Sequence, residues 1–189
     1  MRHNRGLTLV EMLVIVAMLA VMLGILLPAI TRAQAMASRT VCLENLRSMG
    51  RAMDRWSAGH EGVFPRARYL ASPIINSDPN PPLNVVLISQ LSAVTDVFHC
   101  PGDAAWLYQT CGISYFYNFY LSGQRTDWIG TLINPGQSPA EVPTCWDADN
   151  TSFSTLRGTI EVPRFHEVRC SLFADGHSDV LADDATPFF

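Results

Sequence analysis

One uncharged apolar stretch near the N-terminus, residues 12–30, most constrains what this chain can fold into. Its 19 residues are enough for an α-helix to cross the hydrocarbon core of a bilayer, which is about 30 Å thick. A carboxylate, Glu11, stands at the front edge of the stretch. Because an ionisable group entering hydrocarbon costs roughly 2.5–3.5 kcal/mol, Glu11 either marks the water-facing end of an ordinary span or has a functional partner.

A short basic leader, which contains Arg2 and Arg5, precedes Gly6 and the apolar stretch. A secretory signal peptide is cleaved after its apolar region at a small-residue site, and no such site cleanly follows this one. The leader and the stretch instead resemble the prepilin-type cleavage and methylation signal of type IV pilins and of the pseudopilins of type II secretion systems. The resemblance implies that prepilin peptidase cleaves after Gly6 and that Leu7 becomes a methylated N-terminus.

The same resemblance implies assembly roles for two residues. In pilin-like filaments the carboxylate at the position of Glu11 neutralises the N-terminal amine of a neighbouring subunit. Two charges that are each costly alone at low dielectric would satisfy one another in this way. Pro28 stands where many pilins carry a helix-loosening proline, because proline removes a backbone donor and crowds the preceding turn, here near Gly24. A simple kink is the alternative for Pro28.

Helical periodicity continues beyond the apolar stretch. An apolar stripe recurs at steps of three and four, and an arginine stripe at steps of four indicates a solvated face more readily than a binding surface. Gly59 and Gly62 predict the end of the helix. A helix over residues 7–58 would be about 78 Å long. The apolar stripe consists of Cys42, Leu46, Met49, Met53 and Trp56, and the arginine stripe of Arg47, Arg51 and Arg55.

The remainder of the chain predicts a small antiparallel sheet. Asp175-Gly176 between two apolar runs is a strong hairpin signal. The aromatic-rich residues 113–121 indicate a strand that packs in the core, because no basic residues accompany the aromatics as a nucleic-acid platform would require. Further strands are expected at residues 144–147 and 178–181, and residues 161–165 are expected to pair with residues 171–174. Residues 97–103 should be the end of a strand that runs into a turn. Residues 85–88 could be either a strand or a buried helical turn.

We therefore predict an α+β fold in which a long N-terminal helix packs on an antiparallel head. The expected divisions are a leader (residues 1–6), a transmembrane and assembly helix (residues 7–30), an amphipathic continuation (residues 31–62) and a globular β-rich head (residues 63–189). The net charge of −4 becomes −6 without the leader, which gives no support for nucleic-acid binding.

The chain has five cysteines, and an odd number leaves at least one thiol over. The basic leader should stay cytoplasmic, which would place the head outside the cytoplasm, where disulfides are permitted. No two cysteines have the spacing of a zinc motif. Pairs between Cys42 and Cys100 and between Cys145 and Cys170 are expected, with Cys100–Cys111 as an alternative to the first.

A second resemblance covers most of the chain. Its landmarks resemble a large family of bacterial pilin-like proteins, which implies a pilin-like fold and a structural role. In many members nine residues separate the late histidine from the Asp-Gly pair, whereas eight separate them here. The landmarks are Cys42-x-x-Asn45-Leu46, Phe98-x-Cys100-Pro101-x-Asp103, Ser114-Tyr115 to Asn118, and His166 through Phe173-Ala174-Asp175-Gly176-His177.

Two groups of residues could hold a metal, although the leading expectation is that the protein binds no cofactor. His166, Asp175 and His177, with Asp103 as a further donor, could bind zinc or iron. The alternative is that Asp175 shapes its turn and the histidines cap a sheet edge. Separately, the oxygens of the segment from Asp147 to Asn150 could bind calcium, and a solvated turn is the alternative.

The sequence predicts a structural protein and no enzyme, because it shows no nucleophile elbow, phosphate loop or catalytic triad spacing. We expect a pilin-like subunit with a single span in the inner membrane. It would assemble with other pilin or pseudopilin subunits into a type II secretion pseudopilus or a type IV pilus. The alternative is an anchored extracytoplasmic domain that binds a metal or a glycan and never polymerises.

Overall fold

The computed structural model describes residues 8–70, 78–91, 95–103, 107–132, 135–155 and 158–181. The chain divides into two compact units, residues 1–37 and residues 38–189. The leader and the expected cleavage point between Gly6 and Leu7 lie outside the described residues.

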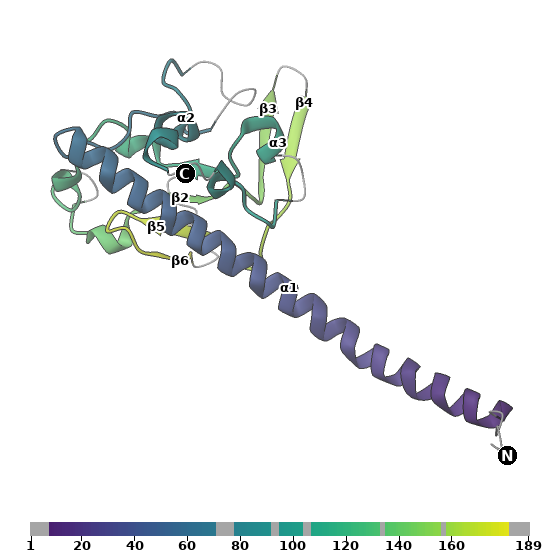
Figure 1. Ribbon diagram of the computed structural model, residues 1–189. Coiled ribbons are helices and arrows are strands. Elements are labelled where there is room, and N and C mark those ends of the chain that lie inside the picture. The colour runs from purple at the N-terminus through teal and green to yellow at the C-terminus, as the bar shows by residue number, and fades with distance from the viewer. Residues whose placement is uncertain are drawn as a thin grey trace. The chain divides into compact units, whose positions relative to one another are not determined.

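A single long helix, α1 (Leu9–Gly59), contributes to both units (Figure 1). All of its residues up to Ala37 are exposed within the chain. The helix expected over residues 7–58 is confirmed, and it is long and apolar enough to cross a membrane. Among the described residues it is the only helix that passes this test.

The last part of α1 packs one face on the head, beside β5 and β6 (Figure 1). The apolar stripe is buried from Cys42 to Met53, and Trp56 packs against its edge. A Cβ atom on Gly50 would lie 2.9 Å from Leu172 Cδ1 and 3.4 Å from the Gly176 carbonyl oxygen. Only glycine therefore allows this close approach of helix and sheet. The arginine stripe is exposed, as expected.

A four-stranded antiparallel sheet carries the head, in the order β1-β2-β5-β6. Trp146 lies opposite Phe116 on one side and opposite Ser171 on the other. A separate antiparallel hairpin is formed by β3 (Thr151–Thr155) and β4 (Gly158–Val162). The α+β, pilin-like layout is thus confirmed. The sheet strands are β1 (Tyr115–Tyr117), β2 (Pro143–Asp147), β5 (Cys170–Phe173) and β6 (Ser178–Val180).

The aromatic run packs in the core, as predicted. All three residues of β1 are buried, and the Tyr117 hydroxyl donates a hydrogen bond to the Pro65 carbonyl oxygen at 2.9 Å. Phe116 stacks on Tyr69, with ring centroids 4.4 Å apart. The strand is nevertheless shorter than expected, because the Asn118 side chain accepts the Tyr120 N–H and starts a short 3₁₀ helix.

Two expectations about the strands need correction, and one open alternative is decided. Residues 85–88, which could have been a strand or a helical turn, are helical: Val85 to Leu87 lie in α2 (Leu83–Leu87), and Ile88 begins a 3₁₀ turn. The expected strand before Cys100 is a 3₁₀ helix that closes when the His99 N–H donates to the Asp96 carbonyl oxygen at 3.0 Å. Residues 161–165 do not pair with residues 171–174, because β5 already has β2 and β6 along its two edges. The helices not yet bounded are α3 (Leu107–Cys111) and the 3₁₀ helices Ile88–Gln90, Thr95–Phe98, Phe119–Leu121, Thr126–Trp128 and Pro139–Glu141.

Candidate functional site

The first candidate site is the start of α1, where Thr8 and Glu11 form a reciprocal cap. The Thr8 backbone N–H and hydroxyl donate to Glu11 Oε2 at 2.7 and 2.8 Å, and the Glu11 N–H donates to the Thr8 hydroxyl at 3.3 Å. This is a capping box, which satisfies backbone donors that a helix start leaves without partners. The other oxygen of Glu11, Oε1, has no hydrogen-bond donor among the described residues. Glu11 therefore has a local structural role and still has acceptor capacity for a second group.

The apolar residues that follow Glu11 are exposed on every side of α1. Leu13 is 64% exposed and Ile25 is 71% exposed. A fully apolar helix surface of this length is unfavourable in water and favourable in lipid or against other helices. The helix continues unbroken through Pro28, whose carbonyl oxygen accepts a hydrogen bond from the Thr31 hydroxyl at 3.0 Å.

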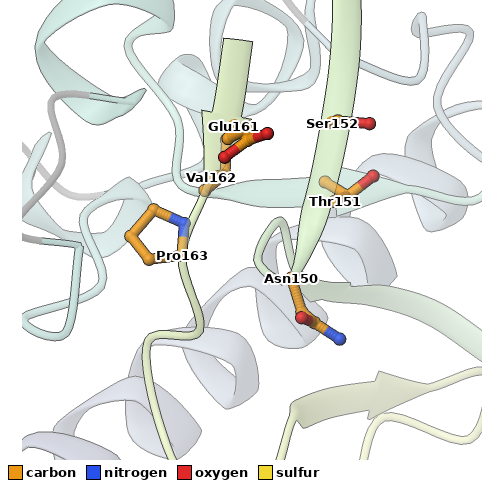
Figure 2. A pocket seen from close by; sticks show the side chains of 6 residues that line it. All are labelled: Asn150, Thr151, Ser152, Glu161, Val162 and Pro163. Atoms are coloured by element: carbon orange, nitrogen blue, oxygen red, sulfur yellow. The ribbon is translucent and has the colours of Figure 1, made fainter.

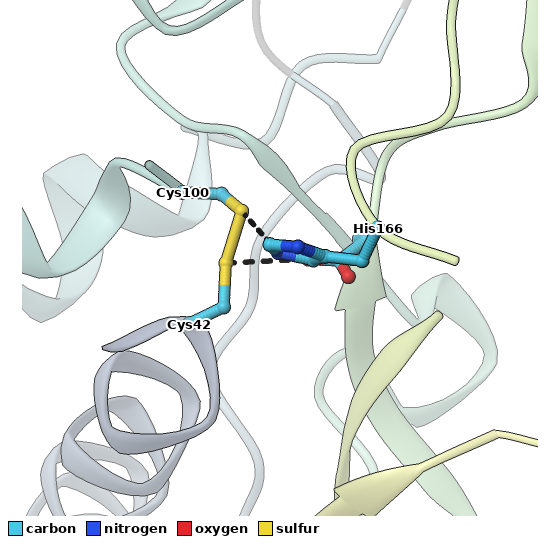
Figure 3. A group of neighbouring side chains, drawn as sticks. Cys42, Cys100 and His166 are labelled. Carbon is cyan, nitrogen blue, oxygen red and sulfur yellow. Dashed lines mark hydrogen bonds between the residues drawn. A yellow bond between two sulfur atoms is a disulfide. The ribbon is translucent and has the colours of Figure 1, made fainter. Parts of the chain in front are cut away.

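The second candidate site is a buried cluster in the head where α1 meets the Cys100 turn. A disulfide joins Cys42 to Cys100, as expected, with their Cα atoms 5.2 Å apart. His166 Nε2 lies 3.1 Å from Cys100 Sγ (Figure 3). Asp147 Oδ1 lies 3.8 Å from Cys42 Sγ. Because these four side chains come from four distant parts of the sequence, only the fold brings them together.

Hydrogen bonds around the cluster fix its geometry. Asp147 Oδ2 accepts the Cys170 N–H at 2.8 Å, and the Tyr115 hydroxyl lies 3.4 Å from Cys42 Sγ. Asn45 of α1 donates to the His99 carbonyl oxygen at 2.8 Å, which ties the helix to the residue before Cys100. Burial raises the pKa of Asp147 to about 7, and burial lowers the pKa of His166.

Glycine at position 102 permits the approach of His166. A Cβ atom there would lie 2.6 Å from the Phe165 carbonyl oxygen and 2.9 Å from His166 Cε1. The Phe165 N–H in turn donates to Asp149 Oδ2 at 2.8 Å, and Arg169 bonds both the Asp149 carboxylate and its carbonyl oxygen. Asp147 and Asp149 are both buried, so the alternative of a solvated turn at these residues is wrong.

The expected grouping of His166 with Asp175 and His177 is not what the structure shows. Asp175 and His177 lie in the turn between β5 and β6, where they bond one another and where the His177 ring stacks on Phe173. Both are partly exposed, whereas His166 is buried. Among the described residues, the group of potential metal ligands contains His166 but neither Asp175 nor His177. Asp175 shapes its turn, as the alternative expectation had it.

Asp103 is likewise occupied elsewhere. Its carboxylate accepts the backbone N–H groups of Leu107 and Tyr108 at the start of α3, and also the Ser114 hydroxyl. A capped helix start explains an acidic residue at this position without a metal.

The expected Cys145–Cys170 bridge is also absent, because both residues are free thiols, as is Cys111. In the register of β2 and β5, Cys145 lies opposite Leu172. Cys170 is therefore a diagonal neighbour of Cys145, and such Cα atoms are about 7–8 Å apart. Disulfides usually need Cα separations of about 4.4–6.8 Å.

A shallow pocket of about 510 Å³ lies beside the β3–β4 hairpin (Figure 2). Among the described residues that line it, Glu161 is the one charged residue, and none is a histidine or cysteine. A lone carboxylate with two hydroxyl groups does not make a nucleophile and base pair.

Comparisons with known proteins bear on the first candidate site. The first 27 residues match the prokaryotic N-terminal methylation motif. This match supports a type IV pilin-like protein that prepilin peptidase processes, and with the apolar helix it supports a single-pass membrane anchor. The motif implies a structural subunit. No curated protein and no solved structure matches the chain.

Sequence reasoning missed two features of these sites. The capping box was readable as Thr8-x-x-Glu11 directly before an apolar run. The cluster of Cys42, Cys100, Asp147 and His166 has no signal in local spacing, because successive members are 58, 47 and 19 residues apart.

Proposed function

We propose that this protein is a pilin-like structural subunit that assembles through its N-terminal helix into a filament. The filament would be a type II secretion pseudopilus or a type IV pilus. Before assembly the subunit would lie in the inner membrane with its head outside the cytoplasm. The single observation that carries the proposal is the exposed, uncharged segment of α1 that follows Glu11, most of which lies within a prepilin-type signal over residues 1–27.

The geometry at Glu11 supports an ion pair between subunits. One carboxylate oxygen holds the helix cap, and Oε1 has no donor among the described residues. Cleavage after Gly6 would create a new amine on Leu7. In a low-dielectric helix bundle each charge is costly alone, so pairing the amine of one subunit with Glu11 of the next favours assembly.

Two variants separate the charge of Glu11 from its capping role. Glu11→Gln removes the charge but keeps an acceptor for the Thr8 N–H, since glutamine also serves in capping boxes. Thr8→Ala weakens the cap but keeps the charge. We expect Glu11→Gln, like Glu11→Ala, to block assembly without affecting membrane insertion, and Thr8→Ala to assemble.

The measurement is photo-crosslinking from a reactive side chain at Val16, followed by separation of the products by mass. The parent protein should give a ladder of covalent multimers, and Glu11→Gln should give monomer only while remaining in the membrane after alkaline extraction. An undiminished ladder from Glu11→Gln would contradict the ion pair. A parent protein without any ladder would favour the alternative, an anchored domain that does not polymerise.

A further inference from the structure

We propose that Cys42, Cys100, Asp147 and His166 form a Zn²⁺ site in the reduced protein, and that the same two sulfurs close the disulfide in the oxidised protein. This inference concerns the head alone. It does not depend on whether the subunit polymerises.

The four donor groups have the chemistry that zinc requires. The two sulfurs are bonded to each other in the oxidised protein, and reduction of the disulfide would let them separate to the spacing of zinc ligands. All four are buried, and their ligand atoms lie within 4.8 Å of one another. Cysteine sulfur, imidazole nitrogen and carboxylate oxygen are each zinc ligands, and four of them suit the tetrahedral geometry that zinc adopts. With ordinary zinc bond lengths, neighbouring donor atoms stand about 3.3–3.8 Å apart. The observed separations are 3.1 Å from Cys100 Sγ to His166 Nε2 and 3.8 Å from Cys42 Sγ to Asp147 Oδ1.

The carboxylate is held in place as metal ligands usually are. Asp147 Oδ2 accepts the Cys170 N–H, which leaves Oδ1 directed at the sulfur of Cys42. Outer hydrogen bonds of this kind orient ligands. In the disulfide form that sulfur carries no hydrogen, so Oδ1 faces a group that cannot donate to it. A cation bound between Oδ1 and the sulfurs of the reduced protein would give this buried carboxylate a charged partner in addition to its hydrogen bonds with Cys170.

The exchange between the two forms balances. When zinc binds, each cysteine thiol loses its proton, and both thiolates, one imidazole nitrogen and one carboxylate oxygen coordinate the ion. Oxidation by a disulfide compound moves two electrons from the two thiolates to that compound, which leaves as two thiolates. The Cys42–Cys100 bond forms, and Zn²⁺ is released with its charge unchanged.

The test uses the full chain in detergent, with and without a phosphine reductant that converts the disulfide to two thiols. Equilibrium dialysis against Zn²⁺ should give one tightly bound ion per reduced chain and none per oxidised chain. Co²⁺ in place of Zn²⁺ should give the strong charge-transfer absorption of two thiolates on a tetrahedral ion. This spectrum comes from the unaltered protein, so it needs no variant to fold.

Ligand variants locate the ion. Asp147→Asn keeps an acceptor for the Cys170 N–H, and His166→Gln keeps a polar side chain of similar reach, so both should fold and lose at least tenfold in zinc affinity. His177→Gln and Cys111→Ser, which alter residues outside the cluster, should bind as the parent does. The proposal is overturned if the reduced chain binds no zinc, if cobalt shows no thiolate absorption, if the oxidised chain binds equally well, or if Asp147→Asn and His166→Gln leave the affinity unchanged.

Discussion

Gly50 sets how closely α1 approaches the sheet, so Gly50→Ala tests the helix-on-sheet packing of the head. The added Cβ would meet Leu172 Cδ1 at 2.9 Å and the Gly176 carbonyl oxygen at 3.4 Å. Leu172 is 1% exposed and cannot move aside into solvent. Overpacking of this kind lowers the free energy of unfolding by about 1–3 kcal/mol. The higher helix propensity of alanine offsets up to about 1 kcal/mol of this loss. We expect a net loss of about 1–2 kcal/mol in the free energy of unfolding.

Gly59→Ala is the matched control, because it makes the same chemical change on the same helix. A Cβ atom on Gly59 would meet nothing within 4 Å. This variant should leave the free energy of unfolding unchanged or raise it slightly. The assay is denaturant unfolding of the detergent-solubilised chain, followed by the fluorescence of tryptophans, of which Trp146 lies in the core.

A double-mutant cycle makes this prediction sharper. Leu172→Ala alone should destabilise the head by about 2–5 kcal/mol because it leaves a cavity. Combined with Gly50→Ala it should cost less than the sum of the two changes, since the alanine Cβ then has room. Equal stabilities for Gly50→Ala and Gly59→Ala, or strict additivity in the cycle, would refute the close approach.

Two further predictions concern the head. The oxidised chain should react with iodoacetamide at three cysteines after unfolding and at none while folded, because the three free thiols are buried. If a second disulfide existed, the intact mass of the unfolded chain would show one labelled cysteine instead. Asp149→Ala should cost about 3–5 kcal/mol, because it leaves Arg169 largely buried without its carboxylate. The exposed pair of Arg125 and Asp127 provides the control, and Asp127→Ala should leave the free energy of unfolding unchanged. If Asp149→Ala and Asp127→Ala had equal effects, the stabilising role of the buried pair of Arg169 and Asp149 would be contradicted.

Strong local patterns in the sequence predicted much of the fold. The steps of three and four along α1 gave both the helix and its buried face, and Asp175-Gly176 gave the β5–β6 hairpin. Strand predictions from weaker patterns failed where a side chain hydrogen-bonds the backbone in place of a neighbouring strand. Asn118 ends β1 by capping the next turn, which residue propensity along the aromatic run does not reveal.

The two candidate sites were predictable to different degrees, because a local pattern can be read from the sequence and a long-range contact cannot. Glu11 and its signal are contiguous, so their pattern could be read directly. The head cluster depends on long-range pairing: β2 brings Asp147 to α1, and Gly102 lets His166 approach the Cys100 turn. The prediction grouped His166 with Asp175 and His177 because they are close in the sequence. In the fold, Asp175 and His177 lie in the turn between β5 and β6, away from the cluster that contains His166.

The N-terminus of the mature protein tests the central claim most directly. Intact and peptide mass spectrometry of the chain from a host with a prepilin peptidase should show an N-terminal methylated Leu7. In a peptidase-deficient host, or with Gly6 replaced by a residue whose Cβ would crowd the cleavage site, the leader should remain. A mature chain that keeps residues 1–6 in the presence of the peptidase, or that begins after the apolar stretch, would contradict a processed pilin-like subunit.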